Sequence, residues 1–432
     1  MGFFTWLRKR TPSQTRRAAR SFRPQLEVLE DRAVPATLTV NTTLDVLGHD
    51  NGLLSLRQAI IDANATPKAD TIILPAGTYT LTRPGAGEYQ CLTGDLDISA
   101  PLTINGAGAG STVIDANGLD RAIDVHSCTV TLSGMTIRGG RASSVVGQSS
   151  FLGEGGAIYN SGTLTVTNCV ISDNSASIAG GGLYNGGTLT VNNSVLSGNS
   201  SSKYGGGIYN YGGSGGTVTV INSTLSGNHA VNGGGAIWND YRAAVTLQGS
   251  STLSGNSAFN GAGVFNQSGT LIVSSCTFSS NSASFEGGAI YNAAAYYGAP
   301  TGTVTIQQNS TLTGNSAARA GGIYNAESGQ VTINGSTLSN NTATYTGGGI
   351  LDYGSVTVSG STLTSNSAGQ AGGGIMLGAS YAIVTVKNSS NITGNTAPVG
   401  YGADVDNLGV LYVDSSSWNL IGTVDGNPAR PI

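Results

Sequence analysis

Charged residues are scarce in this 432-residue chain, and their scarcity excludes several classes of protein. Only 10% of the residues are charged, and the formal net charge is −4. Eight Lys or Arg residues and three acids fall within residues 1–36, so the rest of the chain holds 11 basic and 20 acidic residues. An acidic body of this kind argues against binding to nucleic acid, because phosphates require clustered cations.

Long apolar runs and proline are also lacking. No run approaches the roughly 20 apolar residues that a membrane-spanning helix needs. The chain has 66 glycines but only 11 prolines, and its glycines follow no three-residue repeat. This composition excludes collagen and a disordered low-complexity tail, and it is typical of β structure with many turns.

What the chain does contain is one segment repeated ten times. The first regular copy begins in residues 155–185, GGAIYNSGTLTVTNCVISDNSASIAGGGLYN. Each copy has a Gly-rich step that ends in an apolar residue, an aromatic residue and Asn, then a TLTV segment, then a TLSGNSA segment. The position of that Asn recurs every 25 to 33 residues, at Asn160, Asn185, Asn210, Asn239, Asn266, Asn292, Asn325, Asp352, Leu377 and Asn407. A period of this size is typical of a solenoid, whose units bury their apolar faces only by stacking.

The alternation of apolar and polar residues identifies the type of solenoid. In Thr163–Thr167 the residues alternate as a half-buried strand requires. Three short β segments per copy, separated by Gly and Asn that tolerate left-handed turns, describe one coil of a parallel β-helix. We therefore predict an all-β fold, a right-handed parallel β-helix (solenoid) of about 13 coils, whose hand follows the general crossover rule.

Two columns of asparagine run through the repeats. The first is the Asn that closes the Gly-rich step. The second lies in the TLSGNSA segment, at Asn174, Asn199, Asn228, Asn256, Asn281, Asn315, Asn341, Asn366 and Asn395. Amides that repeat every ~4.8 Å can hydrogen-bond to their equivalents above and below. We therefore interpret both columns as structural ladders.

The four cysteines give no sign of a disulfide framework or a zinc site. Cys169 and Cys276 occupy the same column, four coils apart. At ~4.8 Å per coil their separation is about 19 Å, well beyond the ~7 Å Cα limit for a disulfide. We expect both to be small packed residues, whereas the states of Cys91 and Cys128 are left open.

Residues 1–36 differ from the rest of the chain and are predicted to be a basic export leader that is disordered or removed. They are rich in Arg and show no β alternation, and they lack the apolar core of an ordinary secretory signal. Within them, residues 26–35, LEVLEDRAVP, resemble the LEDR-type leader of large exported bacterial surface proteins. The resemblance implies export, and a solvated basic tail is the alternative.

Residues 37–140 are predicted to form an N-terminal cap and irregular first coils. Apolar residues at helical spacing in residues 53–64, LLSLRQAIIDAN, predict an amphipathic helix that covers the open end of the first coil. With the following DTIILPAGTYTL, this segment resembles the CSLREA domain, which heads secreted bacterial proteins of the parallel β-helix type. Leu54 and Gln58 stand where that family has Cys and Glu, so no role of the family's Cys can be carried over.

The remaining chain divides into three parts by the regularity of its pattern. Residues 141–154 break the alternation and are predicted to be a loop insert. Residues 155–400 are predicted to form the regular coils. Over residues 401–432 the pattern degenerates and Asp404 and Asp406 enter, which predicts a C-terminal cap and tail that block edge-to-edge stacking.

The regular repeats resemble the polymorphic outer-membrane protein repeat. Its GGAI signature occurs at residues 155–158 and 287–290, and its FxxN signature at residues 278–281. The other coils have Leu or Ile in place of Phe. Because proteins of this family are surface adhesins, the resemblance implies a bacterial protein that acts outside the cell or at its surface.

Catalysis is the alternative, because parallel β-helices of the pectin-lyase type cleave polysaccharides with calcium-binding acids beside a basic residue or with paired carboxylates. Residues 155–400 hold only four basic and five acidic residues, which are scattered over different coils. The best location for an active site is the irregular first coils, with Asp115, Asp120, Arg121, Asp124 and His126. Asp95 with Asp97, and Asp404 with Asp406, could each contribute to a cation site, but surface or capping roles explain them better. We predict no catalytic residue, no metal ligand and no cofactor.

The clearest candidate for a binding site is a column of aromatic residues. One ring stands beside the inward apolar residue of the Gly-rich step in seven coils, at Tyr159, Tyr184, Tyr209, Trp238, Phe265, Tyr291 and Tyr324. Alternation makes these side chains face outward, and at ~4.8 Å spacing they form a stripe of about 30 Å. An insert that contains Tyr296 and Tyr297 projects from the same edge. Exposed aromatic surface of this extent often marks an interaction site, so we predict these nine residues to bind a ligand. The alternative is that stacked rings only shield the strands.

Together these features predict an exported bacterial surface or matrix protein without enzymatic activity. It presents an elongated face for adhesion, or for binding to cell-surface glycans or proteins, and it is expected to be monomeric. A polysaccharide-active lyase or hydrolase is the alternative function.

Overall fold

The computed structural model describes residues 35–144, 150–293 and 301–432. Residues Pro35–Ile432 form one compact unit, and Met1–Val34 are set apart from it. Met1–Val34 lie outside the described residues, and with them nearly all of the segment 1–36, so the export leader stays a prediction.

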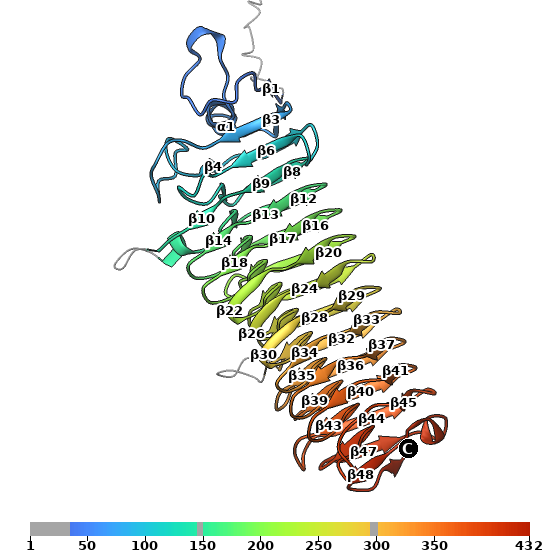
Figure 1. Cartoon of the computed structure of the whole chain (residues 1–432). Helices are drawn as coiled ribbons and strands as arrows, with labels where there is room; N and C mark the ends of the chain where they lie inside the picture. Colours follow the sequence, from blue (N-terminus) through green and yellow to red (C-terminus); the bar gives the residue numbers. More distant parts are fainter. Residues whose placement is uncertain (1–34, 145–149, 294–300) are drawn as a thin grey trace, which may run out of the picture. The chain divides into compact units, whose positions relative to one another are not determined.

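The unit Pro35–Ile432 is a parallel β-helix, in which each coil adds one strand to each of several parallel sheets (Figure 1). Among the described residues, three long sheets contain 15, 12 and 13 strands, here called A, B and C, and a shorter sheet D contains nine. The predicted all-β parallel β-helix is confirmed. The structure forms about 11 turns, somewhat fewer than the predicted 13 coils. The right-handed winding of the coils stays a prediction.

The strands occur in the following order within each sheet. Sheet A contains β1 (Thr37–Thr39), β2 (Asp70–Leu74), β5 (Leu102–Gly106), β8 (Thr129–Ser133), β12 (Thr163–Thr167), β16 (Thr188–Asn192), β20 (Thr217–Ile221), β24 (Ala244–Gln248), β28 (Thr270–Ser274), β32 (Thr303–Gln307), β36 (Gln330–Asn334), β40 (Ser355–Ser359), β44 (Ile383–Lys387), β47 (Val410–Val413) and β49 (Arg430–Pro431). Sheet B contains β3 (Gly77–Thr80), β6 (Thr112–Asp115), β9 (Thr136–Arg138), β13 (Val170–Ser172), β17 (Val195–Ser197), β21 (Thr224–Ser226), β25 (Thr252–Ser254), β29 (Thr277–Ser279), β33 (Thr311–Thr313), β37 (Thr337–Ser339), β41 (Thr362–Thr364) and β45 (Asn391–Thr393).

Sheet C contains β4 (Leu96–Ile98), β7 (Ile123–Val125), β11 (Ile158–Asn160), β15 (Leu183–Asn185), β19 (Ile208–Asn210), β23 (Ile237–Asn239), β27 (Val264–Asn266), β31 (Ile290–Asn292), β35 (Ile323–Asn325), β39 (Ile350–Asp352), β43 (Ile375–Leu377), β46 (Val405–Asn407) and β48 (Val424–Gly426). Sheet D contains β10 (Arg141–Ala142), β14 (Ser175–Ala176), β18 (Ser200–Ser201), β22 (His229–Gly233), β26 (Ser257–Asn260), β30 (Ser282–Glu286), β34 (Ser316–Ala317), β38 (Thr342–Ala343) and β42 (Ser367–Ala368).

The interior of the coils is one continuous apolar core that runs from Val40 to Val413. In each coil, alternate residues of the strands point inward, so sheets A, B and C each contribute apolar side chains, as Val166, Ile171 and Ile158 do in one coil. The same positions of neighbouring coils pair in register. Each coil therefore buries its apolar residues against the coils before and after it.

Both predicted asparagine ladders are present and fully buried. In the ladder between sheets C and A, the Asn160 Nδ2 donates to Asn185 Oδ1 at 2.7 Å. In the ladder between sheets B and D, the Asn174 Nδ2 donates to Asn199 Oδ1 at 3.0 Å. The same bond then repeats from coil to coil, at 2.8 to 2.9 Å in the first ladder through Asn325 and at 2.9 to 3.0 Å in the second through Asn395. Every amide thus finds its partner in the next coil.

Each ladder ends on a carboxylate. The last amides, those of Asn325 and Asn395, donate to Asp352 Oδ1 at 2.7 Å and to Asp404 Oδ1 at 2.9 Å. Because every amide donates toward the C-terminal end of the chain, the final position needs only an acceptor, which a carboxylate supplies. The other oxygen of Asp404 accepts from the Thr423 N–H at 2.8 Å, whereas Asp352 Oδ2 has no hydrogen-bond partner among the described residues.

The predicted helix is α1, Leu56–Asn64, which begins three residues later than the sequence pattern indicates. Its N-cap residue is Ser55, whose Oγ accepts a hydrogen bond from the Gln58 N–H at 3.0 Å. Its apolar residues join the core, as expected for a cap over the first coil. The longest helix of the described residues is α1, with nine residues, and none of these helices has the length and apolar character that a membrane crossing requires.

The less regular segments also contain defined elements. The predicted insert 141–154 contributes β10 and the 3-10 turn Ser150–Gly153. Two further 3-10 turns span Asp50–Gly52 and Trp418–Leu420. The four cysteines are free thiols, in agreement with the prediction for Cys169 and Cys276. Cys91 and Cys128, whose states the sequence left open, therefore form no disulfide either.

The ladder predicts a large cost for removing one amide. Asn256 Nδ2 donates to Asn281 Oδ1 and to Leu225 O, and its Oδ1 accepts from the Asn228 amide. The substitution Asn256→Ala leaves buried partners in two coils unsatisfied, so it should lower the free energy of unfolding by about 3–5 kcal/mol. Urea denaturation measures this, with the exposed Asn232→Ala as control at under ~0.5 kcal/mol. Equal effects of the two substitutions would contradict the ladder.

The terminal acceptor Asp352 predicts a pH dependence of stability. Burial raises the pKa of this carboxyl from 3.8 to about 6, so the folded state favours the protonated form. Its stabilising contribution is present below about pH 4 and is lost as the pH rises through about 6, a change of up to about 3 kcal/mol. The substitution Asp352→Asn should therefore raise the melting temperature at about pH 7.5 and change it little at about pH 4. The exposed Asp173→Asn is the matched control, and an unchanged pH profile in Asp352→Asn would refute the assignment.

Candidate functional site

The outer face of sheet C carries a single column of side chains. The middle residue of each strand lies on the opposite side of the sheet from the core, because its two neighbours point inward. In register, the column reads Asp97, Asp124, Tyr159, Tyr184, Tyr209, Trp238, Phe265, Tyr291, Tyr324, Leu351, Met376, Asp406 and Asp425. Seven aromatic residues thus lie between a pair of acids at each end.

The seven rings form a continuous stack. Neighbouring ring centroids are 4.0 to 6.4 Å apart, and neighbouring ring planes are inclined by 4° to 13°. The closest pair is Trp238 and Phe265, at 4.0 Å and 4°. In-register pairing of the strands places each ring directly over the next, as the sequence repeats predict.

The expectation that this column is an exposed stripe is wrong for its middle part. Tyr184 is 4% exposed, Phe265 is 7% exposed and Trp238 is 9% exposed. The segment that precedes sheet C folds over them: the Tyr204 ring lies 4.4 Å from that of Trp238. A Cβ on Gly233 would lie 2.9 Å from the rings of Phe265 and Trp238, so this close approach requires glycine.

The exposed rings lie beside the stack instead. Large exposed aromatic residues of the regular coils are Tyr211, Tyr241, Phe259, Tyr345 and Tyr381. Each belongs to the segment before a sheet C strand or to the turn after one. We call these five residues the rim; Phe259 reaches 49% exposure and Tyr211 36%. The predicted ligand residues Tyr296 and Tyr297 lie outside the described residues.

Aromatic residues are therefore confined to one edge of the coils. Among the described residues of 155–400, every ring except the core residue Phe278 lies in sheet C, in the segment before it or in the turn after it. The outer faces of sheets A and B carry mainly Thr and Ser. The repeat pattern does not predict the exposure of Phe259 and Tyr345, because the segments before sheet C vary in length and break the column.

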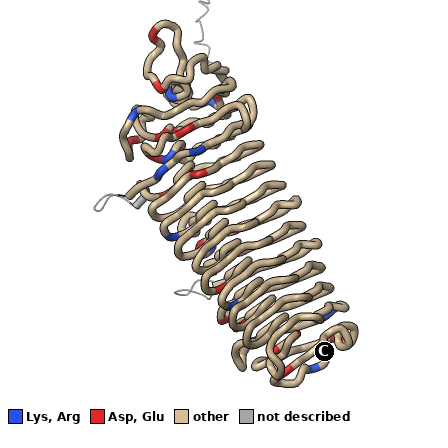
Figure 2. The backbone as a smooth tube through the Cα atoms, viewed as in Figure 1, with Lys and Arg blue, Asp and Glu red and all other residues tan. Residues whose placement is uncertain are grey.

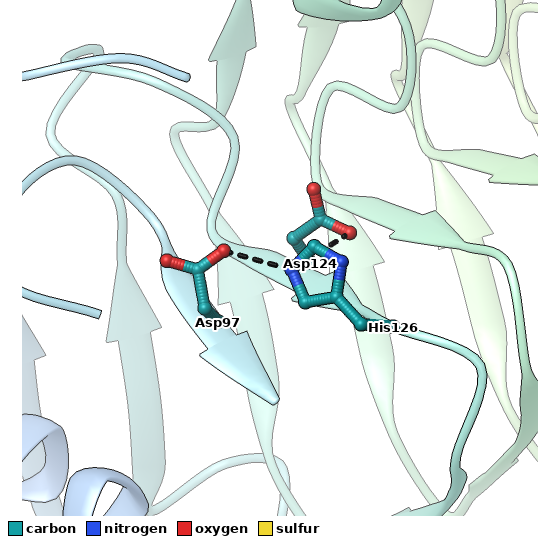
Figure 3. A group of neighbouring side chains, drawn as sticks. All are labelled: Asp97, Asp124 and His126. Atoms are coloured by element: carbon teal, nitrogen blue, oxygen red, sulfur yellow. Dashed lines mark hydrogen bonds and ion pairs between the residues drawn. The ribbon is translucent and has the colours of Figure 1, made fainter. Parts of the chain in front are cut away.

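The N-terminal end of the column is an acidic pocket. Charged residues gather in the first coils, whereas the middle coils carry few (Figure 2). Asp97 and Asp124 pair in register on β4 and β7, and His126 follows two residues later. His126 Nε2 lies 2.9 Å from Asp97 Oδ1 and 3.7 Å from Asp124 Oδ1 (Figure 3). The three side chains come from two neighbouring coils and point toward one another (Figure 3).

Arg121 lies at the centre of a second group of acids. Its Nε lies 3.3 Å from Asp95 Oδ2, and its Nη1 lies 3.4 Å from Asp124 Oδ2. The Asp120 carboxylate accepts from the Arg121 N–H at 2.8 Å. The Arg121 guanidinium also lies over the Tyr159 ring, 5.2 Å from its centroid, so the pocket and the aromatic stack are continuous.

Burial governs the titration of these groups. It raises the pKa of Asp124 to about 6, although Arg121 and His126 oppose the shift. It raises the pKa of Glu154 to about 7, against the attraction of Arg121. The pKa of Asp95 rises for the same reason, whereas the hydrogen bond to Asp97 raises that of His126. Raised carboxyl pKa values beside one arginine are typical of sites that handle protons or cations.

The pocket is small and half open to solvent. It encloses ≈ 220 Å³, and its lining includes Glu88, Tyr89 and Arg121. The Tyr89 ring meets the His126 ring edge-on, with centroids 5.4 Å apart and planes at 84°. The arrangement can hold a cation or a small polar group.

The structure separates the acids that the sequence grouped together. Asp95, Arg121, Asp124 and His126 line the pocket, and Asp120 and Asp97 contact Arg121 and His126 beside it. Asp115 is not part of it and pairs with Arg138 at 3.0 Å. The predicted cation-binding pair Asp404 and Asp406 is not a joint site, because Asp404 ends the ladder and Asp406 lies in the sheet C column.

The buried part of the stack predicts a stability effect. Trp238 is covered by rings on both sides, so the substitution Trp238→Ala should lower the free energy of unfolding by about 3–5 kcal/mol. The exposed Tyr211→Ala should cost less than about 1 kcal/mol. Denaturant titration of both variants checks the difference, and a neutral Trp238→Ala would show that the stack does not stabilise the coils.

Comparison with known protein families supports the repeat assignment. Residues 193–211, 222–240 and 275–293 match the Chlamydia polymorphic membrane protein repeat. Each segment runs from the turn before sheet B, through a ladder asparagine, to sheet C. No curated protein and no solved structure matches the chain. The predicted similarity to this repeat is thus confirmed in these segments, while the resemblance to the CSLREA domain stays a prediction.

Proposed function

We propose that this chain is an exported bacterial surface or matrix protein whose β-helix presents one aromatic edge for adhesion. The observation that carries the proposal is the confinement of the described rings of residues 155–400, apart from the core residue Phe278, to the edge around sheet C. The match to repeats of Chlamydia polymorphic membrane proteins supports a location at the bacterial surface. The rings of the buried stack pack on one another from coil to coil, and the rim supplies the surface that a partner contacts.

A neutral glycan is the partner that this edge favours. Exposed ring faces pack against the apolar C–H faces of sugars, and binding sites of this kind combine aromatic residues with a few polar groups. The middle coils carry few charged residues (Figure 2). A strongly acidic or basic partner would find little complementary charge there. A protein ligand is the other outcome of the test below.

The alternative function, cleavage of polysaccharides, depends on the acidic pocket and not on the rim. Its supporting observation is the group of buried carboxyls with raised pKa beside Arg121. Incubation of the purified chain with acidic and neutral polysaccharides separates the two functions. Adhesion predicts that the polymers stay intact, and chain cleavage would establish the enzyme instead.

The rim predicts which residues carry binding. The triple variant Tyr211→Ser, Phe259→Ser, Tyr345→Ser removes three exposed rings and leaves every residue of the stack and the core in place, although the Tyr211 ring packs on Tyr184 with centroids 6.0 Å apart. We expect glycan-array and cell-adhesion signals to fall at least about tenfold, because aromatic side chains dominate the binding energy of such surfaces.

A matched control removes equally apolar residues from another face. Ile73, Ile272 and Ile383 lie on the outer face of sheet A, and their replacement by Ser should leave binding unchanged. Circular dichroism verifies that both triple variants fold. Binding of the rim variant at the level of the unmodified chain would contradict the proposal, and so would the absence of any glycan signal or cell adhesion.

A further inference from the structure

Three metal-binding side chains converge at the N-terminal end of the sheet C column. Asp97 and Asp124 are in-register neighbours on β4 and β7, and His126 returns to the same face two residues after Asp124. One ligand atom from each lies within 4.8 Å of the others. Around an ion with bonds of ~2.1 Å, tetrahedral ligand atoms are roughly 3.4 Å apart. The two distances from His126 Nε2, 2.9 Å and 3.7 Å, bracket that value.

One of these ligands has a carboxylate oxygen without a hydrogen-bond partner. Asp124 is only 7% exposed and lines the pocket. Its Oδ1 accepts no hydrogen bond from any described group, and it lies 3.7 Å from His126 Nε2. Buried carboxylate oxygens without a hydrogen-bond partner are rare in folded proteins, and a bound ion is one of the features that explain them.

The surrounding charge also calls for a cation. Three buried carboxyls, those of Asp95, Asp120 and Asp124, surround the guanidinium of Arg121, and the buried carboxyl of Asp97 lies beside His126. His126 is the other basic group of the pocket, and Glu154 adds a further buried acid near Arg121. Buried charges of one sign are costly unless an opposite charge compensates them. A divalent ion would reduce this imbalance without moving the backbone.

We propose that Asp97, Asp124 and His126 bind one divalent transition-metal ion, with Zn²⁺ or Mn²⁺ as the ions that fit. One imidazole and two carboxylates suit these ions, whereas Ca²⁺ prefers six or more oxygen ligands. The ion takes the place of the proton between His126 Nε2 and Asp97 Oδ1, and Asp124 Oδ1 completes the set. Asp97 is oriented from behind, because its Oδ2 accepts from the Cys91 N–H at 2.9 Å. The site is open to solvent along His126, whose side chain is 26% exposed.

The test is metal titration of the full chain after treatment with a chelator. Calorimetry with ZnCl₂, MnCl₂ and CaCl₂, each alone at neutral pH, should give one Zn²⁺ or Mn²⁺ per chain and weaker binding of Ca²⁺. The variant His126→Gln removes the imidazole from a partly exposed position, so the fold should persist. Its affinity for Zn²⁺ should fall at least about tenfold, and Asp124→Asn should show a comparable loss.

The matched control is His229→Gln. His229 is exposed on β22 and hydrogen-bonded to Ser257, so its replacement removes an imidazole while the pocket stays intact. Visible absorption of added Co²⁺ gives a second readout that reports the ligands directly, and it should be lost in His126→Gln but kept in His229→Gln. Absence of Zn²⁺ and Mn²⁺ binding would overturn the proposal. Equal binding by His126→Gln and the unmodified chain would overturn it too, even if Asp124→Asn failed to fold.

Discussion

The fold depends on one interaction, the hydrogen bond between the side-chain amides of asparagines in successive coils. A buried amide must satisfy two donors and an acceptor. Each ladder Asn donates to the side chain of the next coil and to a backbone carbonyl, which belongs to its own turn in the first ladder and, from Asn199 on, to the preceding coil in the second. Asn174 Nδ2, for example, donates to Ser172 O at 2.9 Å and to Asn199 Oδ1 at 3.0 Å. Only the same residue type at the same position one coil away can continue this pattern. The ladder therefore fixes the turn, the register of the strands and the repetition of the sequence together.

The polarity of the ladders explains the residues at their ends. Because every amide donates in one direction, Asp352 and Asp404 can end the two ladders as acceptors. The two ends differ in quality, since both oxygens of Asp404 are used and one oxygen of Asp352 is not. Beyond Asp352 the column continues with Leu377, so the first ladder stops before the coils do.

In-register stacking also places equal residues on the outside. The same geometry that aligns the asparagines aligns the rings of sheet C, and so it produces the aromatic stack without a requirement for a ligand. The acids that flank the stack in the sheet C column follow the same rule. Asp97 and Asp124 occupy the aromatic position of the first coils, where two apolar neighbours still point inward.

How much of this the sequence predicts depends on the regularity of each segment. The core, the strands and both ladders follow from strict repeats such as Thr163–Thr167 and were predicted correctly. The covering of Trp238 by Tyr204 was not predicted, because the segment before sheet C differs in length from coil to coil. Its sheet D strand has two residues in β18 and five in β22. The sequence predicted the segment of the pocket but not the pairing of Asp97 with Asp124, since β4 and β7 lie outside the regular repeats. The shared pattern of LDI and IDV was the signal that could have paired Asp97 with Asp124.

Hydrogen exchange of asparagine side chains tests the central claim most directly. Nuclear magnetic resonance of the ¹⁵N-labelled chain resolves side-chain NH₂ groups from backbone amides. If the ladders hold the coils together, the ladder NH₂ groups should exchange far more slowly than those of exposed asparagines such as Asn232, and as slowly as the backbone amides of the core strands. Exchange of the ladder NH₂ groups at the rate of the exposed ones would contradict the account.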